Sequence, residues 1–295
     1  MLLSTQTDVL GARYPENEAI RILASCGFDA YDMSLFYLAG DSHVLCSEKY
    51  KEYAKRLRDE ADNVGIICNQ AHAPFPTGVG KEPDDENIFK KVVRSMEIAS
   101  ILGARNIVVH PKQHLVYADN AEKLFELNVE FYKRLIPYCQ EFNIRVAVEN
   151  MWQRNPNTYS VYDSTCSRAW EFCKYIDAID SPWIIGCLDI GHVSLVGADI
   201  PEFIHTLGNK RLVALHVHDT DLRSDLHTLP YTQKINFDAV AKALGEIDYQ
   251  GDITYEADNF IRGLPKEVLP QAESLMCAIG RHMINVVEEN RPRTK

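Results

Sequence analysis

The sequence lacks long apolar runs and any sign of an export signal. Nowhere do 18 apolar residues follow one another, and residues 1–8 lack the basic and apolar segments of a signal peptide. The eight cysteines include no CxxC pair and no dense framework such as a small secreted domain needs. These absences argue against a membrane protein and a disulfide-stabilised domain. We therefore expect a cytoplasmic protein with reduced thiols and no membrane partner.

Positive charge is also scarce. Lysine and arginine number 31 against 42 aspartates and glutamates, which gives a formal net charge of −11. An acidic chain has no general attraction to polyanions, although a local basic patch is compatible with an acidic total. Nucleic acid is thus disfavoured as a partner.

Neither a glycine-rich phosphate loop nor an interdomain linker is present. Residues 5–14, which follow the first predicted strand, contain a single glycine, Gly11. An open doubly wound sheet usually carries a glycine-rich phosphate-binding motif at this position. No Pro/Gly/Ser-rich tract or charge block divides the chain. We expect one domain spanning residues 1–295.

Short apolar β-type runs alternate with amphipathic helical stretches along the whole chain. The predicted strands are Leu2–Ser4, Ala30–Leu35, Ile66–Ala71, Asn106–His110, Arg145–Glu149, Ile184–Asp189, Val213–His218 and Asp252–Glu256. The predicted helices are Glu16–Cys26, Glu48–Asn63, Asp85–Leu102, Ala121–Phe142, Ser167–Asp177, Pro201–Leu207, Phe237–Ile247 and one near Pro265–Glu289. Eight such units predict an α/β fold, a closed (β/α)8 TIM barrel, ahead of an open sheet.

Acidic and imidazole side chains stand where four of the predicted strands end, and the active site of a TIM barrel forms at these ends. They are Glu149, Asp189, His216 and Glu256. Buried carboxylates that converge repel one another and lose hydration, and a divalent cation removes both penalties. The pattern therefore predicts one divalent cation held by these four residues. Mn²⁺ or Mg²⁺ suits the oxygen ligands, and the imidazole also admits Co²⁺ or Zn²⁺.

The same strand-end series resembles that of the sugar isomerase/epimerase superfamily with xylose-isomerase-like TIM barrels, and the resemblance spans most of the chain. The segment His216-Val217-His218-Asp219 is similar to the His-x-x-Asp/Glu signature of that family's seventh strand. This favours His216 over His218 as the ligand, although both should face the same side of the strand. The resemblance implies a metal-dependent carbohydrate isomerase or epimerase acting on a small-molecule sugar. Barrels of this family often form dimers, so the resemblance is compatible with a homo-oligomer and does not decide the oligomeric state.

Further histidines resemble those of the endonuclease IV type of abasic-site nuclease, which belongs to the same barrel family. His72 and His110 are similar to its third- and fourth-strand histidines, and Asp189-x-x-His192 and Asp225-x-His227 to the motifs that hold its outer zinc ions. This second resemblance implies three Zn²⁺ ions, with Asp225 and His227 as additional ligands, and cleavage of phosphodiesters in abasic DNA.

The loops around the predicted barrel mouth favour a sugar over DNA. A nuclease needs lysine and arginine near the phosphates, yet residues 36–47 and 192–200 contain neither. Four arginines are spread over the loops, enough for one small anion: Arg154, Arg168, Arg223 and Arg262. Aromatic side chains that could stack on a sugar are Phe36, Tyr37, Phe75, Trp152, Tyr159, Tyr162, Tyr231 and Phe260. An unphosphorylated or singly charged polyol fits this mouth better than a polynucleotide.

The expected reaction is proton transfer at a carbon adjacent to a carbonyl, through a metal-stabilised enediolate. Glu149 and Glu256 are the predicted catalytic acid and base, one removing the proton and the other returning it. Proton return to the same carbon gives an epimer, and return to the neighbouring carbon gives an aldose–ketose isomer. Loss of a leaving group instead makes a lyase or dehydratase. The residues expected to bind substrate hydroxyls are His192, His72, His110 and Arg223.

Overall fold

Eight parallel strands form the centre of the computed structural model, which describes residues 1–155 and 157–292. They are β1 (Leu3–Gln6), β2 (Ala30–Ser34), β3 (Ile67–His72), β4 (Asn106–Val109), β5 (Arg145–Glu149), β8 (Ile184–Asp189), β9 (Leu212–His216) and β10 (Ile253–Tyr255). Hydrogen bonds join them in the order β10-β1-β2-β3-β4-β5-β8-β9. A parallel bridge between Val217 and Tyr255 brings β9 next to β10 and nearly closes the barrel.

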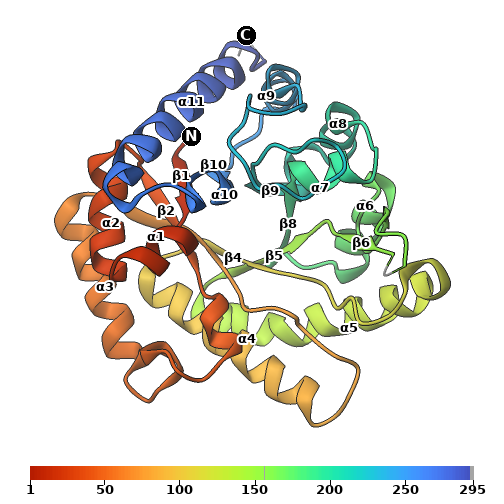
Figure 1. Cartoon of the computed structure of the whole chain (residues 1–295). Helices are drawn as coiled ribbons and strands as arrows, with labels where there is room; N and C mark the ends of the chain where they lie inside the picture. Colours follow the sequence, from red (N-terminus) through yellow and green to blue (C-terminus); the bar gives the residue numbers. More distant parts are fainter. Residues whose placement is uncertain (156, 293–295) are drawn as a thin grey trace.

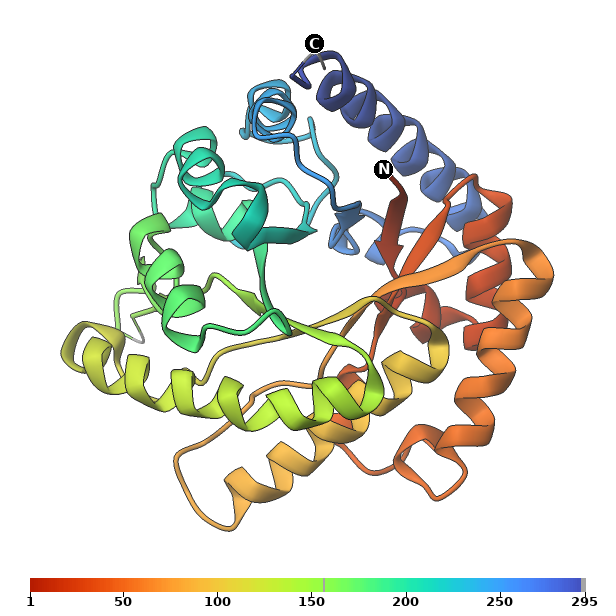
Figure 2. The same ribbon diagram turned by 180° about the vertical axis from the view of Figure 1, so that it is seen from behind.

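A ring of helices surrounds the strands, and the last helix lies beside the first ones, so both ends of the chain meet on one side of the barrel (Figures 1 and 2). The ring consists of α2 (Glu16–Ser25), α3 (Tyr50–Val64), α4 (Asp84–Leu102), α5 (Tyr117–Phe142), α6 (Ala169–Ile179), α8 (Ile200–Arg211), α9 (Phe237–Glu246) and α11 (Leu269–Glu289). Gly65 and Gly103, at φ 76° and 93°, end α3 and α4 in the left-handed conformation. None of the described helices has the length and apolar character needed to cross a bilayer.

The predicted single-domain (β/α)8 barrel is confirmed, and each predicted strand overlaps an observed one. Several short elements after the strands were not predicted from the sequence. They are α1 (Asp8–Arg13), α7 (Ile190–Leu195), α10 (Asn259–Arg262), the 3₁₀ turns η1 (Phe36–Ala39) and η2 (Val44–Cys46), and the antiparallel hairpin of β6 (Trp152–Arg154) and β7 (Val161–Asp163). The 3₁₀ turn η3 (Lys266–Val268) lies at the start of the helix predicted near Pro265–Glu289. Such short segments carry too few residues for a periodic pattern to show.

Two apolar layers hold the barrel together. The larger lies between the strands and the helices, and the smaller fills the inside of the barrel with Val108, Ala147, Ile185, Cys187 and Ala214. Cys187, like the other seven cysteines, is a free thiol. Because successive residues of a strand face opposite sides, the residues two positions after an inner apolar residue also point into the barrel. This alternation sets the positions from which functional groups can meet.

Glu171 of α6 is a buried carboxyl outside the barrel. It accepts a hydrogen bond of 2.8 Å from the Tyr117 hydroxyl through Oε1, while Oε2 has no partner among the described residues. Burial raises its pKa from the ordinary 4.5 to about 7. Between these two values the unfolded chain loses the proton and the folded chain keeps it, so stability falls as pH rises.

The Glu171→Gln variant removes this titration. We expect its free energy of unfolding, relative to the wild type, to rise by about 3 kcal/mol between pH 4.5 and pH 7, at about 1.4 kcal/mol for each pH unit. Urea unfolding at pH 4, 5, 6 and 7 measures the difference. A constant difference over this range would show that Glu171 ionises normally in the folded protein.

Candidate active site and metal centre

The four predicted metal ligands lie together at the C-terminal end of the barrel. Glu149, Asp189 and His216 each follow an inner apolar residue by two positions, so all three point inward. Asp189 is also the direct register partner of His216 across β8 and β9. Glu256 follows β10 and completes the group. One ligand atom from each of the four lies within 4.8 Å of the others.

Burial and close contacts make this group electrostatically unusual. Glu149, Asp189 and His216 are completely buried, and Glu256 is only 8% exposed. Nδ1 of His216 lies 3.2 Å from Oε1 of Glu149 and 3.1 Å from Oε2 of Glu256. One imidazole is therefore shared between two carboxylates, away from water.

Burial alone would keep both glutamates protonated, but their neighbours reverse that effect. His216 and His110 hold the pKa of Glu149 well below its ordinary value, and His216 followed by His227 lowers the pKa of Glu256. Burial also opposes a charged imidazole at His216, yet Glu256 foremost raises the pKa of His216 well above its usual value. The two carboxylates are thus ionised at neutral pH, as ligands or bases must be.

Neighbouring polar side chains that the sequence analysis did not single out hold these groups in place. Gln6, the last residue of β1, donates a hydrogen bond of 2.7 Å to Oε1 of Glu256. The side-chain amide of Asn150 forms two hydrogen bonds with the backbone of Asp189 at the end of β8. It donates to the Asp189 carbonyl at 3.0 Å and accepts from the Asp189 N–H at 2.7 Å. The Asn150 carbonyl lies 2.8 Å from Nδ1 of His192. In the sequence, the one feature that could have identified Gln6 and Asn150 as site residues is their position at the ends of strands.

A second group of potential ligands shares Glu149 with the first. His72 and His110 lie 3.1 Å apart through their Nε2 atoms, and Nε2 of His110 lies 3.1 Å from Oε2 of Glu149. Ligand atoms of all three fall within 4.8 Å of one another. Burial lowers the pKa of His110, which favours the neutral imidazole that binds metals.

A third group lies on the other side, built from His192, His218, Asp225 and His227. Oδ2 of Asp225 lies 3.1 Å from Nε2 of His227 and 3.6 Å from Nε2 of His192. Nε2 of His218 lies 3.1 Å from Oδ1 of Asp189, which links this group to the first. Burial opposes protonation of His227, but Asp225 raises the pKa of its imidazole to about 10.

The chemistry of these groups fits divalent cations. Oδ1 of Asp225 is buried without a hydrogen-bond partner in the described part of the chain, and Oε2 of Glu149 makes no hydrogen bond although Nε2 of His110 lies 3.1 Å from it. Unpartnered buried polar atoms are costly, and a cation offers what they lack. Carboxylate oxygens with an imidazole suit Mn²⁺, Mg²⁺, Co²⁺ or Zn²⁺, so the donor set does not select one ion.

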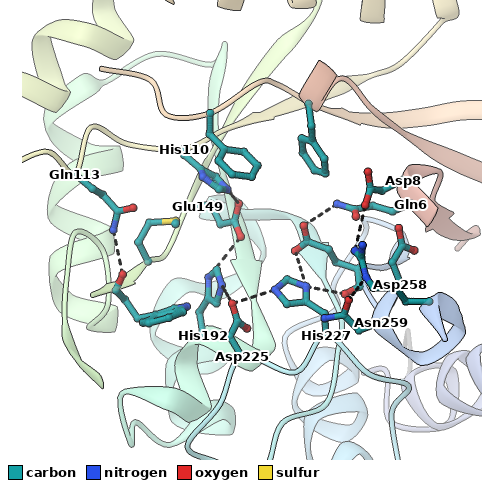
Figure 3. A pocket seen from close by; sticks show the side chains of 16 residues that line it. Gln6, Asp8, His110, Gln113, Glu149, His192, Asp225, His227, Asp258 and Asn259 are labelled. Carbon is teal, nitrogen blue, oxygen red and sulfur yellow. Dashed lines mark hydrogen bonds and ion pairs between the residues drawn. The ribbon is translucent and has the colours of Figure 1, made fainter. Parts of the chain in front are cut away.

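Six members of these groups line a cavity of about 460 Å³ at the barrel mouth: His110, Glu149, His192, Asp225, His227 and Glu256. Asp189, His216 and His218 are not among its lining residues. Figure 3 shows His110, Glu149, His192, Asp225 and His227 pointing into it. Polar side chains on the opposite wall are Gln6, Asp8, Asp258 and Asn259. Burial raises the pKa of the Asp258 carboxyl to about 8, so that wall carries a neutral acid at pH 7.

Some of the residues expected at the mouth lie elsewhere. Arg223 is exposed and does not line the cavity, and its backbone N–H donates a hydrogen bond to the Asp221 carboxylate. His72 lies beneath the surface of the cavity rather than on it, 1% exposed. Of the eight aromatic residues named from the sequence, Phe36, Phe75 and Trp152 line the cavity. Arg262 is the one arginine or lysine among its lining residues.

Two curated relatives cover most of this chain. It is 25% identical to the “Putative L-ribulose-5-phosphate 3-epimerase SgbU” of Escherichia coli K12, over 81% of this chain and 82% of that protein. It is 27% identical to a “Probable endonuclease 4” of Bacillus licheniformis, over 62% and 63% of the two chains.

Solved structures share the fold across the whole chain. A D-tagatose 3-epimerase-like protein superposes with a TM-score of 0.75 at 20% identity, covering 98% of this chain and 99% of that one. The IolI protein, solved with a bound zinc atom, superposes with a TM-score of 0.72 at 16% identity, covering 99% and 100%. The profile of the xylose isomerase-like TIM barrel family matches residues 20–275. This chain therefore belongs to the xylose isomerase-like TIM barrel family.

Proposed function

We propose that this protein is a divalent-metal-dependent sugar isomerase or epimerase that moves a proton at a carbon next to a carbonyl. The observation that carries the proposal is the pair of buried, ionised carboxylates, Glu149 and Glu256, which line one cavity with a single imidazole between them. The sugar epimerases among the relatives and structural neighbours support the same reaction class.

The residues of the chain divide the work between them. Glu149 and Glu256 come from β5 and from the residue after β10, so they approach a bound sugar from different sides. One ionised carboxylate accepts the proton from the carbon, and the other must first take up a proton from solvent before it can return one to the opposite side. Gln6 fixes Glu256 in position, and His110 and His192, which line the cavity, are placed to bind hydroxyls.

Glu149, Asp189, His216 and Glu256 would hold the cation. When bound, the cation supplies a positive charge that stabilises negative charge developing on the substrate oxygens. A carboxylate that also serves as a ligand stays ionised through this charge and remains ready to accept a proton.

Charge around the cavity favours an uncharged sugar over a sugar phosphate. Arg262 is the single cationic lysine or arginine side chain on the lining, and its guanidinium lies 3.4 Å from the Asp8 carboxylate. A phosphate dianion would find no unpaired lysine or arginine on the lining and would meet the carboxylates of Asp8, Glu149, Asp225 and Glu256.

Proton exchange with solvent tests the proposal directly. Incubation of the Mn²⁺-loaded protein in D₂O with a panel of ketoses and keto-glycosides should place deuterium at the carbon next to the carbonyl and form an epimer or aldose, seen by NMR. Release of water or another leaving group would indicate lyase chemistry instead. Failure of every panel member to exchange would contradict the proposal.

The three neighbouring ligand groups favour one second candidate, a zinc phosphodiesterase like the endonuclease 4 relatives. Together they offer ligands for up to three cations. Against it stand the net charge of −11 and the single arginine of the cavity lining. Incision of an abasic-site duplex by Zn²⁺-loaded protein holding three ions per chain would select this candidate, and one bound ion without incision would reject it.

A further inference from the structure

A second cavity of about 330 Å³ opens beside the first, between the loops that follow β3 and β4. We call it the side groove, and it is formed by residues 75–79 together with His110, Pro111, Gln113 and His114. Phe75, His110 and Gln113 line both cavities, so the two lie side by side. Its volume alone lies within the roughly 300–1,000 Å³ that ligand sites occupy.

We propose that the side groove holds a second sugar ring, joined by a glycosidic bond to the ring bound at Glu149 and Glu256. The preferred substrate is then a glycoside of disaccharide size rather than a free monosaccharide. This inference rests on the proposed function, and it assigns a substrate class to the same site.

An exposed and rigid apolar surface marks the boundary between the two cavities. Phe75 is 45% exposed although it lies in a recess, and Val79 is 40% exposed. The Phe75 ring is fixed by an edge contact with Phe36, at 5.1 Å between centroids, and by stacking on His110 at 4.9 Å. Apolar groups exposed in a recess indicate a ligand surface, and the apolar face of a sugar ring matches a phenyl ring that is already immobilised.

Unpartnered polar groups line the deeper part of the side groove. Thr77 is 2% exposed, and its Oγ1 has no hydrogen-bond partner in residues 1–155 and 157–292. Nδ1 of His114 is buried and unpartnered in the same region. The Gln113 amide nitrogen donates to the Trp152 carbonyl at 3.2 Å and to Oγ of Ser164 at 2.8 Å, which fixes Gln113 where the cavities meet. Sugar hydroxyls can both donate to and accept from such groups.

The charge of the side groove distinguishes a sugar from a nucleic acid. Among the described residues that line it, none is a lysine or arginine. Lys112 comes from the same loop, but its Nζ lies 3.0 Å from the Asp85 carboxylate and is already paired. A DNA strand that continued from the main cavity would need cations along its phosphates. A neutral second ring needs none.

Binding of two matched sugars tests the inference without requiring turnover. Fructose is compared with maltulose, its 4-O-glucoside, by calorimetric titration of the Mn²⁺-loaded full chain. We expect maltulose to bind at least about tenfold more tightly than fructose to the wild type. Thr77→Val keeps the side-chain shape and removes the hydroxyl, so it should weaken maltulose binding about 5–10-fold and leave fructose binding unchanged. Val79→Glu changes an exposed side chain and leaves the core undisturbed, and it should likewise weaken maltulose binding and leave fructose binding unchanged.

The outcomes separate this inference from the proposed function. Equal affinity for the two sugars, or variants that weaken both sugars equally or neither, would overturn the second-ring assignment even if fructose were turned over. A preference for maltulose that the wild type shows and that both variants lose would uphold the second-ring assignment. The absence of deuterium incorporation into these two sugars and into every other member of the panel would count against the isomerase or epimerase reaction alone.

Discussion

Replacement of Glu149 or Glu256 by glutamine is expected to lower kcat/KM for epimerisation or isomerisation by about 10²–10⁴-fold. Glutamine preserves shape and one oxygen but cannot accept a proton from carbon. Both carboxylates are held ionised by His216, so the substitution removes a functioning base rather than a neutral acid. Steady-state rates on the sugar identified by the exchange panel give the measurement.

The exchange behaviour of the two variants is more diagnostic than their rates. If the residues act on opposite sides of the substrate, Glu149→Gln still exchanges the proton of one epimer with D₂O, and Glu256→Gln exchanges the proton of the other. Metal content must be measured alongside, because both residues are proposed ligands and a lost cation would stop both exchanges. Glu171→Gln makes the same chemical change outside the cavity and should leave the rates unchanged. Near-normal turnover in both site variants would rule out the two-base scheme.

The fold could be predicted because its pattern is regular and repeated. Each unit combines a short apolar run with an amphipathic helix, and no linker interrupts the series. The convergence of Glu149, Asp189 and His216 followed from the same regularity, because a parallel barrel brings all its strand ends to one mouth. Alternation along the strands then points all three inward.

The rest of the site depends on distances that no local pattern encodes. Gln6 contacts Glu256 across 250 positions of sequence, and His218 meets Asp225 only because a loop folds back over the mouth. Asp225 and His227 come from this loop between β9 and α9, whose course is set by tertiary contacts. Arg223 belongs to the same loop, and its exposed position likewise could not be derived from its neighbours in the sequence.

Removal of the cation with a chelator is expected to abolish turnover and to lower the Tm by about 5–10 °C. A ligand present at about 100 times its Kd contributes about 2.7 kcal/mol, and a chain of this size shifts by roughly 2–4 °C for each kcal/mol. The buried carboxylates of Glu149, Asp189 and Glu256 would lose their main compensating charge. Added Mn²⁺ should restore both properties. Asp189→Asn should weaken cation binding, whereas Asp177→Asn, in a surface ion pair with Arg211, should not.

The affinity for the cation should also fall as the pH is lowered. The pKa of His216 is raised well above its usual value in the metal-free protein, chiefly by Glu256 against the effect of burial, so this imidazole carries a proton at neutral pH. A cation binds only the neutral ring, and each binding event must therefore release that proton. The apparent Kd should rise up to about tenfold for each pH unit below the pKa of His216, for each proton released. Titrations at pH 6, 7 and 8 in two buffers of different ionisation enthalpy measure both the affinity and the proton count. If the affinity did not depend on pH and no proton were released, the cation would not be displacing the proton of His216. This result would remove His216 from the proposed ligand set.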